Sequence, residues 1–312
     1  MSDKKLISVV TPCYNEELNV EEVYTQVKAV FADLPQYRYE HIFIDNASPD
    51  NTVAVLKKLA AADYNVKIIV NIKNFGHIRS PYYGLLQAHG DAVVSIVSDL
   101  QDPPAMIKEF LQKWEEGNAI VVGVKNQSEE NGLMFAVRKV YYNLIKKLSD
   151  IEQIKNFTGF GLYDQKFISV LRTLKDPYPY FRGLITEVGF NRAEIPYVQP
   201  ARKKGKTSNN FYSLYDLAML GFVNHSKIPL RLASFIGFGM GVISFVVGII
   251  YLVYKLLFWS RFQAGLAPLT IGIFFFSSIQ LFFIGILGEY IGAIYTQVRE
   301  RPLVIEKERV NF

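Results

Sequence analysis

The chain of 312 residues contains a single cysteine, Cys13. One cysteine excludes an intramolecular disulfide framework and fits a reducing compartment. The first residues lack the apolar stretch and the small-residue cleavage site of a signal peptide, so we expect none. The glycine-rich dinucleotide fingerprint and the P-loop pattern are also absent from the sequence, which argues against nucleotide binding through either loop.

Charge of one sign does not dominate the chain either. It has 34 Lys and Arg residues against 29 Asp and Glu residues, a net charge of +5. No nucleic-acid-binding module accompanies the basic residues, so nucleic acid is a poor candidate for a partner. Half of the residues are hydrophobic, and much of this excess follows Leu232.

The first part of the chain alternates between short apolar runs and segments with apolar residues at helical spacing. Strands separated by helices of this length predict right-handed βαβ units, a mostly parallel sheet and hence an α/β fold. The predicted strands are 6–11, 41–44, 66–70, 92–97 and 120–124, and the predicted helices are 16–34, 52–62, 80–89 and 106–116.

Polar residues follow three of these strands where each strand ends: Pro12 to Glu16, Asp45 to Asp50, and Asp99 to Asp102. The carboxyl ends of parallel strands meet at one edge of a sheet, where α/β proteins bind ligands. The oxygens of Asp99 and Gln101 suit Mg²⁺ or Mn²⁺ that carries a diphosphate. The alternative is that each Asp only caps a turn or a helix. Three clusters at one edge favour a binding site.

Basic residues in the middle of the chain suit an anionic ligand. Arg138 falls on a segment with amphipathic helical spacing, and Arg202 begins a basic run that ends at Lys206. Basic side chains near a membrane surface attract anionic headgroups by about 1 kcal/mol each. The alternative is a solvated basic face, which suits the lysines after Arg138, whereas the loop setting of Arg202 favours a function.

The last part of the chain contains two long apolar runs. Leu232 to Tyr254 has no charged residue, and Leu266 to Tyr295 has only Glu289. Each run exceeds the roughly 20 residues that cross a bilayer. The basic flanks predict that the main domain and both termini are cytoplasmic. Small residues such as Gly237 and Gly288 allow close helix packing and a homo-oligomer.

These patterns predict a multi-pass protein of the cytoplasmic (inner or plasma) membrane with four parts. An α/β domain is followed by an amphipathic juxtamembrane segment, a pair of transmembrane helices and a cytoplasmic tail. The predicted ranges are 1–208, 209–231, 232–298 with helices at about 232–258 and 266–295, and 299–312.

Four motifs carry a resemblance to a known family: Val-Val-Thr-Pro-Cys-Tyr-Asn-Glu-Glu (9–17), Ile-Asp-Asn-Ala-Ser-Pro-Asp-Asn-Thr (44–52), Asn-Phe-Gly (74–76) and Ser-Asp-Leu-Gln-Asp-Pro-Pro (98–104). With them the sequence resembles a family 2 glycosyltransferase of GT-A fold, which has a Rossmann-like, mostly parallel sheet. More narrowly, it is similar to the polyprenyl-phosphate glycosyltransferases, which include dolichol-phosphate mannose synthases and bacterial undecaprenyl-phosphate sugar transferases. The resemblance runs through nearly the whole chain.

The resemblance implies roles for individual residues. Asp99 and Gln101 would hold Mg²⁺ or Mn²⁺, and Arg138 and Arg202 would meet the lipid phosphate. These four form the implied catalytic set. The implied nucleotide-binding set consists of Pro12, Tyr14, Asn15, Glu16, Asp45, Ser48 and Asp99. The donor is expected to be UDP-linked, with guanine as the alternative base.

Three positions depart from the family pattern. Val97 stands where the family usually has the first acid of an Asp-x-Asp motif, and Asn46 stands where it has a second acid after the second strand. Thr158 to Asp164 lacks the Asp and Arg of the family's Thr-Gly-Asp-Phe-Arg-Leu segment, and Asp164 itself matches a later position. A phosphate acceptor with a second pKa of about 6 is mostly ionised at neutral pH, so it can attack without a strong general base.

The predicted activity is the transfer of a sugar, with inversion, from a nucleotide diphosphate sugar to polyprenyl phosphate at the cytoplasmic membrane face. One alternative is a processive polysaccharide synthase. Two crossings and the lack of a Gln-x-x-Arg-Trp segment disfavour it. The other alternative is a non-catalytic, membrane-anchored nucleotide-sugar-binding protein, which Val97 and the missing acid after Gly159 motivate.

Overall fold

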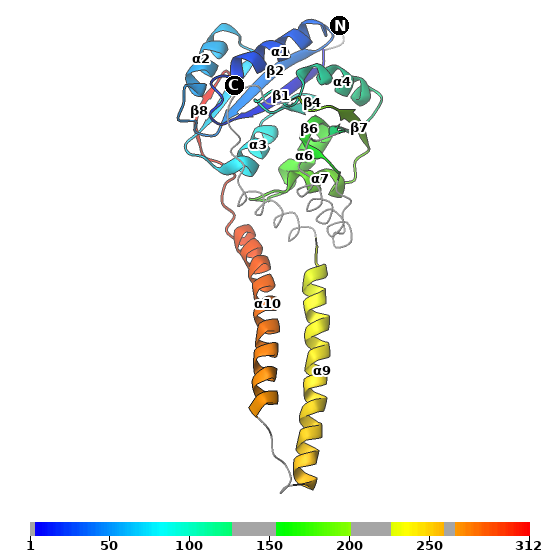
Figure 1. Cartoon of the computed structure of the whole chain (residues 1–312). Coiled ribbons are helices and arrows are strands. Elements are labelled where there is room, and N and C mark those ends of the chain that lie inside the picture. Colours follow the sequence, from blue (N-terminus) through cyan, green and yellow to red (C-terminus); the bar gives the residue numbers. More distant parts are fainter. Residues whose placement is uncertain (1–3, 127–153, 201–225, 259–265) are drawn as a thin grey trace.

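The computed structural model describes residues 4–126, 154–200, 226–258 and 266–312 of the chain. These residues form a domain built on one sheet, from which two long helices extend (Figure 1). The elements are β1 (Leu6–Cys13), α1 (Val20–Ala32), β2 (Arg38–Asp45), α2 (Thr52–Ala62), β3 (Val66–Asn71), α3 (Gly76–Leu86), β4 (Ala92–Ser95), η1 (Pro104–Met106), α4 (Ile107–Glu115), β5 (Ile120–Lys125), β6 (Phe157–Asp164), α6 (Gln165–Thr173), α7 (Phe181–Glu187), β7 (Arg192–Tyr197), α9 (Ile228–Leu257), α10 (Leu266–Val298) and β8 (Glu306–Val310).

Within the described residues the sheet has eight strands in the order β7-β5-β6-β4-β1-β2-β3-β8. The pairs β4–β1, β1–β2, β2–β3 and β5–β7 are parallel. The pairs β4–β6, β5–β6 and β3–β8 are antiparallel. The predicted α/β fold with a mostly parallel sheet is confirmed. The sequence analysis did not predict β6, β7 or β8.

Helices cover both faces of the sheet. Helices α1, α2 and α4 pack on one face, and helices α3, α6 and α7 pack on the other. Neighbouring residues of β1 show the alternation, because Val9 joins the core under α1 and α4 while Val10 joins the core under α3. A strand buried on both faces reads as a continuous apolar run, which is why these strands were visible in the sequence.

Several element ends differ from the predicted ones for local reasons. Strand β4 ends at Ser95: the Ile96 amide still donates to the Val10 carbonyl at 3.1 Å, and the Val97 amide then donates to the Asp102 side chain at 3.4 Å and not to the sheet. Helix α1 starts at Val20 and not at Glu16, since a turn comes first, in which the Glu16 carbonyl accepts from the amides of Asn19 at 2.9 Å and Val20 at 3.1 Å. Helix α3 starts at Gly76, whose amide donates to the Asn74 side chain at 2.7 Å.

Helices α9 and α10 lie side by side and extend away from the domain (Figure 1). Both are long and apolar enough to cross a membrane, and their side chains are exposed in the isolated chain. Near the domain, the Tyr290 hydroxyl of α10 donates to the Ser226 carbonyl at 2.6 Å. The pair fits the predicted transmembrane hairpin. Most of the predicted amphipathic segment lies outside the described residues.

Candidate functional site

The three polar clusters follow β4, β1 and β2, which are neighbouring parallel strands in the sheet. Cys13, at the end of β1, is the register partner of Asp45, at the end of β2. The clusters therefore come together at the carboxyl edge of the sheet, as the strand pattern predicted. Direct contacts between the loops that follow these strands define the shape of this edge.

The loop after β1 exposes some of its predicted site residues and buries others. Tyr14 is 39% exposed, and Asn15 is exposed in a left-handed conformation (φ 58°). Pro12 lies in β1 opposite Ile44 and is half-buried. Glu16 is buried, and its carboxylate accepts from Asn19 Nδ2 at 2.6 Å. Tyr14 is thus exposed at the carboxyl edge of the sheet, whereas the Glu16 carboxylate holds the loop in shape.

The loop after β2 is shaped by Asp45, which has no exposed surface. Its Oδ2 accepts from the Ser48 amide at 3.0 Å, and its Oδ1 accepts from Ser48 Oγ at 2.5 Å. Burial raises the pKa of Asp45 above its ordinary value. Ser48 Oγ also accepts from the Asn15 amide at 3.0 Å and so joins the two loops. A direct contact of Asp45 with a nucleotide stays a prediction.

Asn46, where the family usually has an acid, connects the loop after β2 to the loop after β3. Its Nδ2 donates to Asn74 Oδ1 at 2.9 Å and to the Gly76 carbonyl at 3.1 Å. Its Oδ1 accepts from Asn71 Nδ2 at 3.2 Å and from the Phe75 amide at 2.9 Å. A carboxylate at this position could not donate. The amide is therefore the side chain that these contacts require.

The loop after β4 presents the two predicted metal ligands, Asp99 and Gln101, at the same edge. Both are partly exposed. Asp99 Oδ1 accepts from the Gln101 amide at 3.1 Å, and Leu100 between them is left-handed (φ 60°). No group of three or more His, Cys, Asp or Glu residues suited to a metal occurs in the part of the chain that the structure describes. One carboxylate and one amide fit Mg²⁺ or Mn²⁺, which usually take their other ligands from substrate phosphates and water.

Two residues at this edge received no role in the sequence analysis. The Tyr197 hydroxyl, at the end of β7, donates to Asp102 Oδ1 at 2.9 Å. Asp102 is 2% exposed, and burial raises its pKa to about 6, opposed by the hydrogen bond from Tyr197. The two residues are 95 positions apart, so no local pattern connects them. The only sequence signal was the place of Asp102 within the strand-end cluster.

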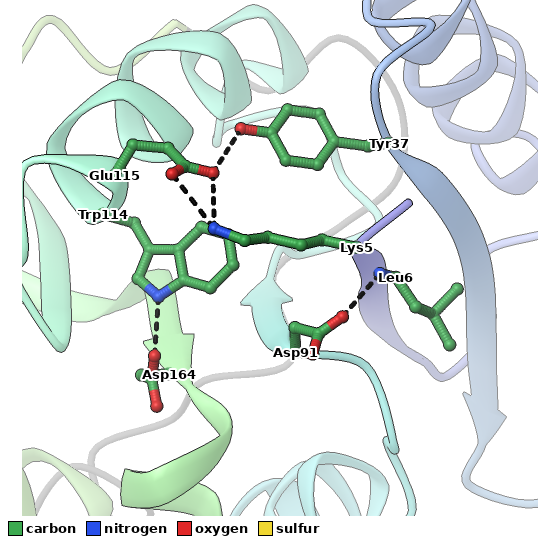
Figure 2. A network of polar contacts seen from close by, with 7 residues as sticks. All are labelled: Lys5, Leu6, Tyr37, Asp91, Trp114, Glu115 and Asp164. Atoms are coloured by element: carbon green, nitrogen blue, oxygen red, sulfur yellow. Dashed lines mark hydrogen bonds and ion pairs between the residues drawn. The ribbon is translucent and has the colours of Figure 1, made fainter. Parts of the chain in front are cut away.

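Asp164 lies beside the amino end of β4, on the side of the sheet away from these clusters. It pairs with Ala92 at the amino end of β4 and caps α6 by accepting from the Lys166 amide at 2.8 Å. Figure 2 shows it accepting from Trp114 Nε1, beside the ion pair between Lys5 and Glu115. This network ties the start of β1 to the end of α4 and has a structural role. Asp164 therefore does not replace the acid missing after Gly159.

The remaining predicted catalytic residues, Arg138 and Arg202, lie outside the described residues. In the segment where the family has its Thr-Gly-Asp motif, Gly159 is left-handed (φ 107°) and Phe160 is buried against Phe110 and Tyr197. The position after Gly159 thus belongs to the hydrophobic core.

The fold and the polar edge define an α/β protein of the Rossmann-like type, with a candidate ligand site at the carboxyl ends of its strands. The model of the family "Glycosyl transferase family 2" matches residues 8–171, which is just over half of the chain. The chain belongs to glycosyl transferase family 2. The predicted family membership and the GT-A fold with a C-terminal helical hairpin are thereby confirmed.

Several relatives match over nearly their whole length. The uncharacterized glycosyltransferase YkcC of Bacillus subtilis is 36% identical over 96% of this chain and 92% of its own. The bactoprenol glucosyl transferase of Shigella phage SfII is 32% identical over 97% of both chains. Among solved structures, the mannosyltransferase PcManGT of Pyrobaculum calidifontis with GDP-Man and Mn²⁺ is 15% identical, with a TM-score of 0.48 over 71% of this chain and 63% of its own.

Proposed function

We propose that this glycosyltransferase moves a sugar from a nucleotide diphosphate sugar, UDP-linked, to a polyprenyl phosphate, with inversion, at the cytoplasmic face of the membrane. The observation that carries the proposal is the match to a bactoprenol glucosyl transferase over 97% of both chains. That match includes the sheet domain and both apolar helices. A relative that shared only the sheet domain would support no lipid acceptor.

The donor is proposed to bind at the carboxyl edge of β1, β2 and β4. The exposed aromatic side chain of Tyr14 would stack on a base, and the loops after β1 and β2 are already joined through Ser48. Asp99 and Gln101 would hold Mg²⁺ or Mn²⁺, which would neutralise charge on the leaving diphosphate. The proposed nucleotide contacts are Pro12, Tyr14, Asn15, Glu16, Asp45, Ser48 and Asp99.

The proposed reaction needs little proton transfer. An oxygen of the lipid phosphate attacks the anomeric carbon of the sugar from the face opposite the diphosphate. The new carbon–oxygen bond forms as the bond to the nucleoside diphosphate breaks, and the configuration inverts. The acceptor phosphate is mostly ionised near neutral pH because its second pKa is about 6. The protein's task is then to position the two substrates and to balance their charge.

The acceptor is proposed to reach the site from the membrane. Helices α9 and α10 are long enough to cross it, and Arg138 and Arg202 would pair with the lipid phosphate. In this arrangement residues 1–208 form the catalytic domain, 209–231 lie along the interface, and 299–312 return to the cytoplasm, where β8 joins the sheet of the domain. The packing of α9 and α10 would also permit a homo-oligomer.

The test is lipid-product formation by the purified full-length protein in detergent. Polyprenyl phosphate, Mg²⁺ or Mn²⁺ and a panel of labelled nucleotide sugars are supplied, and label in an organic-soluble product is counted. We expect a product that carries one sugar per lipid. Asp99→Ala should lower its rate by roughly 100-fold or more, because an interaction with the leaving diphosphate is lost.

The matched control is Asp33→Ala. Asp33 carries the same group in an exposed ion pair with Lys108, so its loss should leave the rate near that of the wild type. Nucleotide binding without any product would favour the non-catalytic alternative. A long polymer would favour a processive synthase. Equal rates for Asp99→Ala and the wild type would move the metal site elsewhere.

A further inference from the structure

The loop between β4 and η1 is closed by one of its own side chains. The Val97 amide donates to Asp102 Oδ2 at 3.4 Å across the base of the loop. Inside it, the Gln101 amide donates to Asp99 Oδ1 at 3.1 Å, and Leu100 adopts a left-handed backbone (φ 60°). A branched residue at this φ is strained, so the loop keeps its shape only while surrounding contacts hold it.

Asp102 is the polar group that connects the loop to β7, while Leu100 of the same loop packs into the hydrophobic core. Asp102 is 2% exposed, whereas Asp99 and Gln101 are partly exposed on the same loop. A buried carboxylate is costly unless hydrogen bonds satisfy its oxygens. Here Oδ2 accepts from Val97 within the loop and Oδ1 accepts from Tyr197 outside it, at 2.9 Å. The carboxylate thus bridges the loop to β7.

Tyr197 is itself held firmly by the neighbouring strands. Its ring packs edge-on against Phe160 of β6, with 5.4 Å between the ring centroids. Gly123 of β5 leaves the space for both rings, because a Cβ there would lie 3.2 Å from Tyr197 Cε1 and 2.7 Å from Phe160 Cδ1. The hydroxyl that meets Asp102 is therefore fixed by packing and provides a rigid anchor.

We infer that Asp102 and Tyr197 are positioning residues for the metal and the donor diphosphate. Their hydrogen bond holds the loop in the conformation in which Asp99 and Gln101 present their oxygens side by side. Neither residue needs to touch the ligand. The inference rests on the proposed function, because it assumes that Asp99 and Gln101 are the metal ligands. Partners that orient ligands in this way commonly change metal affinity by 10- to 100-fold when they are lost.

The test variant is Tyr197→Phe, which removes the hydroxyl and keeps the packed ring. Binding of Mn²⁺ is measured by calorimetry on the full-length protein in detergent with UDP present. We expect the Kd of Mn²⁺ to rise roughly tenfold. The half-saturating Mn²⁺ concentration for product formation should rise by the same factor, and saturating Mn²⁺ should restore a rate near that of the wild type. A purely structural role would not predict this rescue by metal.

The matched control is Tyr24→Phe. The Tyr24 hydroxyl donates to Asp63 Oδ2, also at 2.9 Å, between α1 and the residue that follows α2. It is also a hydrogen bond from a tyrosine hydroxyl to an aspartate, but neither residue belongs to the loop between β4 and η1 or to β7. The control should bind Mn²⁺ like the wild type. Unchanged Mn²⁺ binding in Tyr197→Phe, or an equal change in the control, would overturn the inference.

A second variant, Asp102→Asn, tests whether the two residues act through one bond. Combined with Tyr197→Phe, it should weaken Mn²⁺ binding by less than the product of the two single effects. Independent effects would contradict the inference. A wild type that binds Mn²⁺ with UDP but forms no lipid-linked sugar would refute the proposed function alone, since the binding comparison would still decide the role of Asp102 and Tyr197. Product formation that needs no divalent cation would leave the sugar transfer standing and refute the metal site together with the positioning role.

Discussion

His41 is a buried titratable residue in the middle of β2, away from the candidate site. It has no exposed surface, and its Nε2 lies 2.9 Å from Thr11 Oγ1 on β1. Its ring packs on Phe43, with the centroids 3.9 Å apart. Burial lowers the pKa of His41 to about 3, and attraction to Asp63 opposes this shift without reversing it. The native protein therefore holds His41 in its neutral form.

This shift predicts a loss of stability in mild acid. The unfolded chain binds a proton at His41 with a pKa of about 6.5, whereas the native protein binds one only near pH 3. The stabilisation is thus complete above about pH 6.5 and is lost as the pH falls, by about 1.4 kcal/mol per unit. The loss of stability is measured by comparing thermal unfolding near pH 7.5 with thermal unfolding near pH 5.5. In His41→Gln the difference between the two conditions should shrink, and an unchanged difference would contradict the assignment.

At the scale of elements, β8 closes one edge of the sheet with residues from the end of the chain. It pairs antiparallel with β3, whose sequence is apolar. Asn311 Nδ2 donates to the carbonyls of Ala60 at 2.8 Å and Val66 at 2.9 Å, and Glu308 pairs with Lys57. An uncovered apolar edge strand is a template for aggregation. The C-terminal strand therefore protects β3 and also returns the chain from α10 to the domain (Figure 1).

Ending the chain after Ile305 removes β8 and should expose the edge of β3. We expect the free energy of unfolding of the domain to fall by roughly 2 kcal/mol or more, because several ladder hydrogen bonds are lost. Light scattering should also show concentration-dependent association. The control is Lys57→Gln, which removes only an exposed ion pair and should change stability by less than about 0.5 kcal/mol. A truncated protein as stable and as monodisperse as the full chain would contradict the role of β8.

At the scale of the whole molecule, the near ends of α9 and α10 lie on the same side of the domain (Figure 1). Gln297 Nε2, near the end of α10, donates to Asp176 Oδ1 at 2.8 Å, and the Arg79 guanidinium donates to the Pro302 carbonyl. The first described residue, Lys4, and the last, Phe312, both contact the domain: the Lys4 carbonyl accepts from Arg38 Nε, and Lys67 Nζ lies over the Phe312 ring. If the hairpin crosses the membrane twice, as proposed, the domain lies wholly on one side of it, together with Lys4 and Phe312.

This arrangement predicts the labelling pattern of single cysteines in intact cells. In a Cys13→Ser background, a membrane-impermeant maleimide should label Gln263→Cys directly. Phe312→Cys should be labelled only after the cells are permeabilised, because the basic flanks favour the cytoplasmic side. The Cys13→Ser protein without a new cysteine provides the blank. Labelling of Phe312→Cys in intact cells would show that the domain faces outward.

Much of the order of elements could be predicted from the chain alone. The strands from β1 to β5 and their helices follow from apolar runs and helical spacing, which depend only on nearby residues. The gathering of the Asp45 and Asp99 clusters at one edge follows from the parallel strands. The exact ends of β4 and α3 could not be predicted. They depend on side chains that accept from backbone amides: Asp102 accepts from Val97 just after β4, and Asn74 accepts from Gly76 at the start of α3.

The sequence by itself determined the α/β class, the strand-end clusters and the apolar hairpin, because each depends on composition or spacing within a short window. Only the tertiary structure decided that β6 enters antiparallel between β4 and β5, that β8 covers β3, and that Tyr197 holds Asp102. These choices join residues far apart in the chain. Such long-range contacts form because burial and hydrogen bonding in the folded domain outweigh the entropy lost in closing long loops. A local pattern of residues does not predict this balance.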